Sequence, residues 1–257
     1  MQLMDQWEAF KTIVIREVKR FMRIWVQTLV PPAITIALYF VIFGNLIGSR
    51  IGEMGGYDYM QFVVPGLIMM AIIQNSYGNV VSSFFGTKFQ RNIEEMLVSP
   101  VSEYTILCGF VVGGMARGFV VGAIVTVLSL FFTRLSVESW AITISMVVLT
   151  SIVFSLAGFI NAVFAESFDD IAIIPTFVLT PLIYLGGVFY SVDLLPDFWA
   201  KVSLLNPVLY MVNGFRHGIL GVSDVSVQVS FAMLFVFVVA GFTFSMYLLK
   251  RAERLRS

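Results

Sequence analysis

The chain has 257 residues, of which 58% are hydrophobic and only 12% are charged. A soluble domain carries about 25% charged residues, so this composition excludes an ordinary soluble protein and indicates one integral membrane domain. The formal net charge is zero, which excludes the overall basic field expected of a protein that binds nucleic acid.

An amphipathic segment opens the chain at residues 1–23. Trp7, Phe10, Val14 and Val18 recur with a helical period, and charged residues separate them. This pattern predicts a helix with a basic polar face that lies on the cytoplasmic surface of the membrane. A plain helical extension of the first membrane span is the alternative.

Six stretches are apolar and long enough to cross a bilayer, which takes about 20 residues of helix. They lie within a transmembrane domain at 24–250, with spans at approximately 26–48, 62–85, 110–133, 140–164, 171–190 and 228–249. The predicted fold class is therefore an all-α integral membrane protein. Lys and Arg concentrate in residues 1–23 and in the tail 251–257, so we expect both ends in the cytoplasm, which requires an even number of spans.

A polar stripe marks the second predicted span. Asn75, Asn79, Ser82 and Gly86 are spaced by four, three and four residues, so they share one helical face. Amide side chains are costly in lipid, and this face is therefore expected to point to another helix or to an aqueous path.

The third predicted span contains a ridge of small residues, Gly114, Gly118 and Gly122. Such a ridge lets two helix backbones approach closely, although the sequence does not identify the partner helix. Arg117 adjoins the ridge. We expect its side chain to reach the inner membrane surface, and a buried functional charge is the alternative.

Two predicted cytoplasmic loops have the composition of docking surfaces. Residues 87–104 form an amphipathic helical stretch that ends at Pro100, and residues 165–170 place three acids and one Phe between two spans. Short elements with exposed apolar residues favour contact with a soluble partner. An ordinary solvated linker is the alternative, above all for 165–170.

Residues 191–224 are too polar to cross the membrane comfortably. A seventh span here would also place the basic tail outside the cell, against the distribution of Lys and Arg. We therefore expect the segment to enter from the outer face and turn back. Irregular backbone at membrane depth needs protein or a wet cavity beside it, so the segment should line a path.

Sequence motifs for catalysis are missing. No G-x-x-x-x-G-K-[ST] phosphate-binding loop occurs, and the single Cys and single His leave no metal-binding cluster. An enzyme acting on lipid-linked substrates would have to rely on Asp193, Asp197 and His217. Without a nucleophile or a metal cluster, this alternative is weak.

Residues 175–221, PTFVLTPLIYLGGVFYSVDLLPDFWAKVSLLNPVLYMVNGFRHGILG, resemble the membrane subunit of type-2 ABC exporters, the ABC-2 permease family. Residues 91–109, RNIEEMLVSPVSEYTILCG, resemble the family's segment after the second span. The usual Lys after this Gly is absent, because Phe110 follows Gly109. The likeness extends over about residues 10–250.

The resemblance implies six spans, an amphipathic interface helix at 1–23, a coupling helix at 87–104 and a re-entrant outer gate at 191–224. It implies a multi-pass protein of the bacterial inner membrane in which two permease copies face each other. Two copies of a separate ABC ATPase would dock beneath them and bind ATP and Mg, so this chain itself would hold no cofactor and would not be an enzyme.

The same resemblance implies three groups of functional residues. The ATPase-coupling group is Phe89, Arg91, Glu94, Glu95, Phe168, Asp169 and Asp170. The translocation path group is Asn75, Asn79, Thr176, Thr180, Tyr184 and Tyr190. The outer gate group is Asn206, Pro207, Tyr210, Asn213, Arg216 and His217, whose polar side chains we expect to face water, substrate or the opposite gate, unless Arg216 and His217 sit only at headgroup level.

An ion-coupled secondary transporter or channel is the main alternative. Such proteins place ionisable groups near the middle of the membrane, and apart from Arg117 the sequence offers no clear case. The cargo is not readable from the sequence, so drug, lipid, glycan and small-metabolite export all stay open.

Overall fold

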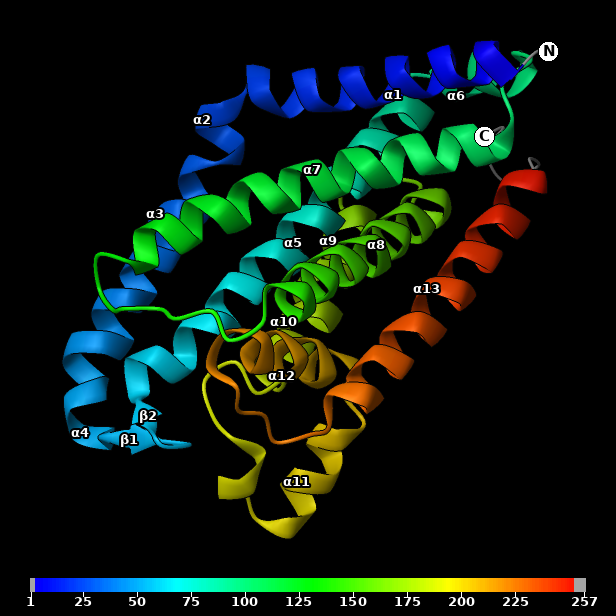
Figure 1. Ribbon diagram of the computed structural model, residues 1–257. Helices are drawn as coiled ribbons and strands as arrows, with labels where there is room; N and C mark the ends of the chain where they lie inside the picture. Colours follow the sequence, from blue (N-terminus) through cyan, green and yellow to red (C-terminus); the bar gives the residue numbers. More distant parts are fainter. Residues whose placement is uncertain (1–2, 252–257) are drawn as a thin grey trace.

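The computed structural model describes residues 3–251, and it is helical except for one short hairpin (Figure 1). The first elements, in chain order, are α1 (Leu3–Arg23), α2 (Trp25–Thr28), α3 (Val30–Tyr39), the π-helix η1 (Phe40–Gly48) and α4 (Ser49–Ile51). Pro31 and Pro32 lie in the first turn of α3, where a missing backbone N–H breaks no intrahelical bond.

A two-stranded antiparallel hairpin follows, which the all-α prediction did not include. Its strands are β1 (Glu53–Met54) and β2 (Tyr57–Asp58). Gly55 and Gly56 form the turn with φ angles of 62° and 81°, which glycine adopts without steric cost. The Asp58 side chain then caps the next helix, α5 (Tyr59–Phe89).

Helix α5 forms the centre of the molecule, and most of its 31 residues are buried (Figure 1). The short α6 (Asn92–Val98) follows, and then α7 (Glu103–Ser129) and α8 (Trp140–Phe164), which both pack along α5. Ser102 and Ser139 accept hydrogen bonds from the first-turn N–H groups of α7 and α8. The bounds of α8 agree with the predicted span 140–164, whereas α7 begins and ends earlier than the predicted 110–133.

Seven further elements complete the chain. They are α9 (Asp170–Ile174), the π-helix η2 (Pro175–Leu179), α10 (Thr180–Tyr184), the 3₁₀ turn η3 (Val192–Leu194), α11 (Asp197–Leu204), α12 (Pro207–Leu220) and α13 (Val227–Lys250). The predicted span 171–190 extends beyond the C-terminal end of the helix. The helix stops at Tyr184, and Gly187 follows with a φ of 70°.

The prediction of a helical, multi-span membrane protein is confirmed. Four helical segments among residues 3–251 are long and apolar enough to cross a membrane: Trp25–Gly48, Glu103–Ser129, Trp140–Phe164 and Val227–Lys250. Helix α5 is also long but carries several polar residues, and the apolar segment Asp170–Tyr184 is shorter. The count of six spans, the interfacial position of α1 and the re-entrant gate stay predictions. Residues 1–2 and 252–257, which belong to the predicted interface helix and tail, lie outside the described residues.

The glycine ridge of α7 packs against α5. A Cβ atom on Gly114 would lie 2.4 Å from the Ser155 hydroxyl of α8 and 2.6 Å from Val80 of α5. A Cβ atom on Gly118 would lie 2.1 Å from the Ser76 hydroxyl of α5. All three distances are far below van der Waals contact, so only glycine permits this backbone approach. The partner helix that the sequence left open is therefore α5, with α8 also close at Gly114.

Two further glycines on α7 allow α1 to pack closely against this helix. Cβ atoms on Gly109 and Gly113 would lie 2.5 Å from side-chain atoms of Ile13 and Glu17, respectively. Helix α1 therefore lies directly on α7, as Figure 1 shows, and buries Ile13, Glu17 and Phe21 on one face. Trp7, predicted on the apolar face, is 56% exposed.

Candidate functional site

Two aromatic side chains, one from the last turn of α5 and one from the loop after α8, meet at the C-terminal ends of these helices. The ring centroids of Phe89 and Phe168 lie 5.0 Å apart in an edge-to-face arrangement, and Phe168 makes an equally close contact with Phe85. Phe89 and Phe168 are 61% and 56% exposed, so they form a surface patch and not a core contact. The loops predicted as separate docking elements thus form one surface.

Lys88 holds the two helix ends together beneath this patch. Its buried ammonium group donates hydrogen bonds to the carbonyl oxygens of Val163 and Ala165 at 2.9 and 2.8 Å. These carbonyls end α8, where the helix dipole is negative and a cation is favourable. Sequence analysis did not single out Lys88, because a lysine beside a predicted loop normally indicates a solvated residue.

The predicted coupling segment 87–104 is divided in the structure. Helix α5 continues to Phe89, and a turn follows in which Arg91 has a φ of 62°. Glu94 and Glu95 then lie exposed in the first turn of the separate helix α6. The expectation that Phe89 shares a helix with these acids is wrong, because the left-handed conformation at Arg91 interrupts the helix.

The second loop, 165–170, is ordered by one of its own acids. The Asp170 carboxylate accepts hydrogen bonds from the backbone N–H groups of Glu166 and Ser167, both at 2.9 Å. These bonds hold the pKa of Asp170 below its usual value. Asp170 therefore shapes the loop, whereas Asp169 points outward and is exposed.

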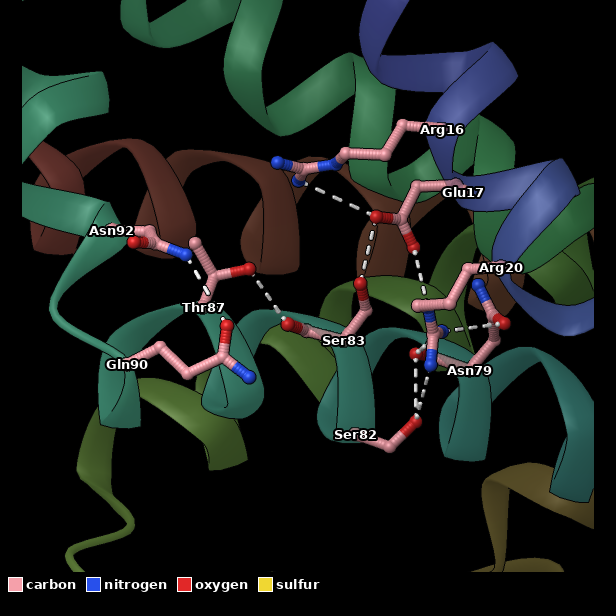
Figure 2. A network of polar contacts seen from close by, with 9 residues as sticks. All are labelled: Arg16, Glu17, Arg20, Asn79, Ser82, Ser83, Thr87, Gln90 and Asn92. Carbon is pink, nitrogen blue, oxygen red and sulfur yellow. Dashed lines mark hydrogen bonds and ion pairs between the residues drawn. The ribbon is translucent and has the colours of Figure 1, made fainter.

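A buried polar cluster joins α1 to α5 (Figure 2). The Glu17 carboxylate is fully buried, accepts a hydrogen bond from the Ser83 hydroxyl at 2.7 Å, and lies 3.5 Å from guanidinium nitrogens of both Arg16 and Arg20. Arg20 in turn donates to the backbone and side-chain oxygens of Asn79, both at 2.9 Å. Burial lowers the pKa of the Arg20 guanidinium, and the Glu17 carboxylate opposes this shift.

The polar stripe of α5 thus has two kinds of neighbour. Asn79 and Ser82 contact Arg20 of α1, so these two residues point to another helix and not to an aqueous path. Gly86 instead lines a cavity of about 1060 Å³ between α1 and α5. Asn75 donates to the carbonyl of Ala71 in its own helix and is buried.

The remaining predicted path residues lie on or after the α9–η2–α10 segment. Thr176 and Tyr184 are exposed, and the Tyr184 hydroxyl is hydrogen-bonded to that of Tyr39 on α3. Thr180 donates to the carbonyl of Pro175, and Tyr190 donates to that of Leu185. Whether these residues and the buried Asn75 and Asn79 share one path stays a prediction.

The outer segment turns its charged residue inward. Arg216 of α12 is fully buried, donates to the carbonyls of Gly187 at 2.6 Å and Phe62 at 3.3 Å, and stacks 3.8 Å above the Phe62 ring. Asn213 is also fully buried and accepts a hydrogen bond from the Asp224 backbone N–H. Neither Arg216 nor Asn213 reaches water in this structure, contrary to the expectation of a water-facing position, and Nη1 of the buried Arg216 guanidinium has no hydrogen-bond partner among residues 3–251. Their contact with substrate or with a facing gate stays a prediction.

Asn206 sets the break between α11 and α12. Its side-chain oxygen accepts from the Val208 N–H and caps α12, and its amide donates to the Leu182 carbonyl at 2.6 Å. Pro207 then occupies the first position of α12, which suits a residue without an N–H. Tyr210 and His217 are half-buried, and the Tyr210 hydroxyl donates to the Leu204 carbonyl.

Comparison with known sequences identifies the protein family of this chain. Residues 8–220 match the family of ABC-2 type transporters. The chain belongs to the ABC-2 type transporter family. The resemblance drawn from residues 175–221 and 91–109 is therefore confirmed, and membership implies association with an ABC ATPase in a transporter, not independent enzymatic activity.

Relatives extend over most of this ABC-2 chain. It is 60% identical over 251 residues, or 98% of both chains, to the inner membrane transport permease YadH of Escherichia coli strain K12. It is 23% identical over 218 residues, or 83% of both chains, to nodulation protein J of Rhizobium leguminosarum bv. viciae. It is 24% identical over 209 residues to nodulation protein J of Sinorhizobium fredii, covering 80% of this chain and 79% of the relative.

Within residues 3–251, no group of three or more His, Cys, Asp or Glu residues is arranged to hold a metal ion.

Proposed function

We propose that this chain is the permease subunit of an ATP-driven ABC exporter in a bacterial inner membrane, with both termini in the cytoplasm. Two copies form the translocation path, and two copies of a separate ATPase bind them and carry ATP and Mg. Family membership and the name of the Escherichia coli relative support the proposal. The sequence contains no phosphate-binding loop motif, which supports a nucleotide site in another chain.

The observation that carries the proposal is the joint surface at the ends of α5 and α8, here called the docking surface. It consists of Phe89, Arg91, Glu94, Glu95, Phe168 and Asp169. Its aromatic pair is exposed, and exposed charged residues follow both rings in the chain, a composition that suits a contact site for a soluble protein.

The helix packing offers a route from the docking surface to the opposite end of the molecule. Because Lys88 and Phe168 join the ends of α5 and α8, a push at this surface moves the two helices as one body. The other end of α5 carries Phe62, roughly 40 Å away along the helix at 1.5 Å per residue. There Arg216 of α12 binds the Phe62 carbonyl, so motion of α5 reaches the predicted outer gate.

Transport also requires the cargo to bind the open and closed states of the path with different affinities. A ligand that binds both states equally does not shift the equilibrium between them. The exposed side chains between Thr176 and Tyr184 are suited to face a second copy across the path, whereas Leu179 and Ile183 are buried. An ion-coupled transporter would instead need a titratable group inside the path.

The docking surface is tested by charge reversal. We expect Glu94→Lys combined with Glu95→Lys to abolish co-purification of the ATPase with the tagged permease, while membrane insertion is unchanged. Glu53→Lys combined with Glu138→Lys is the matched control, since both acids are exposed and lie at the other end of α5 and α8. Unchanged ATPase recovery with the first pair would remove this surface from the mechanism.

A further inference from the structure

A large cavity lies between α1 and the C-terminal half of α5, and the proposed export function does not use it. Its volume is about 1060 Å³, which is in the range of ligand-binding sites. Residues of α1 form one wall, and residues of α5 and α6 form the other. The polar and charged lining side chains are Thr12, Arg16, Glu17, Lys19, Arg20, Arg23, Ser82, Ser83, Thr87, Gln90 and Asn92.

The cavity is strongly basic. Glu17 is its single acidic lining residue, and this carboxylate is already engaged by Ser83, Arg16 and Arg20. Within the described part of the chain, no carboxylate lies within ion-pair distance of Lys19 or Arg23. These two cations face the cavity without a counter-charge, so an anion there would gain attraction that the protein itself does not supply.

The opposite wall supplies neutral hydrogen-bond donors and open space. The Gln90 side-chain oxygen accepts from Asn92, which leaves the Gln90 amide N–H groups free for a ligand, as the arrangement in Figure 2 shows. Gly86 faces the same space, and a Cβ atom placed on it would meet nothing within 4 Å. The glycine thus leaves room in the cavity and is not needed for close helix packing.

We propose that this cavity binds a phosphate group, carried either by an anionic lipid headgroup or by a phosphate-bearing solute. Lysine and arginine with amide donors are the side chains that recognise phosphate oxygens. Basic pockets between membrane helices on the cytoplasmic side are typical binding sites of anionic lipid headgroups. The inference does not depend on the docking surface or on the ATPase.

The rim of the cavity favours the lipid as the source of the phosphate. Ile15 and Met22 line it with apolar side chains that are 51% and 45% exposed. Ile24, Trp25 and Val26 continue this exposed apolar surface towards the first predicted span. A headgroup in the cavity would therefore have an apolar surface beside it on which its acyl chains could lie.

The test measures lipid binding to the full-length purified chain in detergent by native mass spectrometry. Phosphatidylglycerol is the anionic probe, phosphatidylcholine is the neutral control, and glycerol 1-phosphate is the soluble competitor. Two variants change the cavity, Gly86→Leu to fill it and Lys19→Gln with Arg23→Gln to remove its free charge. The matched controls are Gly78→Leu, whose Cβ also meets nothing, and Lys11→Gln, a basic residue of α1 already paired with Glu8.

We expect the chain to bind phosphatidylglycerol in preference to phosphatidylcholine. Removing the two charges should weaken phosphatidylglycerol binding on the order of 20-fold, since each basic side chain near an anionic lipid contributes roughly fivefold. Gly86→Leu should abolish the preference, and both controls should keep it. Displacement by glycerol 1-phosphate would support a solute as ligand, and its failure to compete would support a lipid.

Equal binding of the two lipids by the unaltered chain would overturn the proposal. So would a loss with Lys11→Gln as large as that with the Lys19 and Arg23 variant, because the effect would then come from the charge of α1 as a whole. If Gly86→Leu failed to fold, the charge variant and its control would still decide the outcome.

Discussion

Phe89 and Phe168 are 79 residues apart in the chain, yet their rings lie edge to face with centroids 5.0 Å apart. Phe89 ends α5, and Phe168 lies in the loop between α8 and α9. Because both rings remain more than half exposed, their contact creates an apolar surface that the chain itself leaves uncovered. We propose that a soluble partner binds the protein at this surface.

The aromatic pair is expected to dominate ATPase binding. Replacing Phe89 and Phe168 together by Ala should weaken the affinity for the ATPase by about tenfold or more, as expected for central aromatic residues of an interface. The measurement is ATPase retained on the immobilised permease over a concentration series. Phe131→Ala is the control, because Phe131 is 81% exposed and follows the C-terminal end of α7, away from the docking surface. Equal retention by the double variant and this control would contradict the expectation.

Lys88 is expected to position the docking surface without touching the partner. Lys88→Met keeps the length of the side chain but leaves the Val163 and Ala165 carbonyls without their donor, at a cost of about 1–3 kcal/mol. Thermal unfolding in detergent should therefore shift downwards, and ATPase binding should fall as well. Lys11→Met, at an exposed ion pair, should change neither. A Lys88 variant as stable as the unaltered protein would show that the helix ends are held by other contacts.

Glu17 is expected to stabilise the packing of α1 against α5 and α7. Glu17→Gln preserves the shape and the contact with Ser83 but removes the charge opposite Arg20, so we expect a loss of about 1–3 kcal/mol. Glu8→Gln removes an exposed partner of Lys11 and should cost less than about 1 kcal/mol. Both losses are measured as shifts of the unfolding temperature. Identical shifts would mean that the Glu17 charge is dispensable for the fold.

The glycine ridge gives a steric prediction. Gly118→Ala would place a methyl group 2.1 Å from the Ser76 hydroxyl and should destabilise the protein by about 1–3 kcal/mol. Gly78→Ala meets open space and should be neutral or stabilising by up to about 1 kcal/mol. The comparison of the two unfolding temperatures tests the packing, and a Gly118 variant at least as stable as the Gly78 variant would refute it.

The ends of individual helices were predictable from the sequence where a capping residue or a polar loop marks them. Helix α8 has the same bounds as the span predicted at 140–164, because Ser139 caps its start and a polar loop follows its end. The final span, predicted at 228–249, differs from α13 by one residue at each end. The fifth was extended too far, since its helix ends at Tyr184 although the sequence stays apolar to Tyr190.

The partners of polar residues were harder to predict. Periodicity assigns a charged residue of an amphipathic helix to the solvent, and Glu17 is buried because Gly113 of α7 leaves room for it. The same limit applies to Arg216, which the sequence placed at a water-facing gate and which backbone carbonyls hold inside the protein. One signal was present for Glu17, namely the unexplained Gly109 and Gly113 beside the recognised ridge. Pairing of the two cytoplasmic loops through Phe89 and Phe168 required three-dimensional information.

The most direct measurement is native mass spectrometry of the tagged chain purified from the membranes of its own host. The central claim is that the chain transports only together with an ATP-hydrolysing partner. We therefore predict a complex of two permease chains with two ABC ATPase chains, and its loss on combining Phe89→Ala with Phe168→Ala. A chain that is recovered without any ATPase, and that drives transport from an ion gradient alone after reconstitution, would contradict the claim.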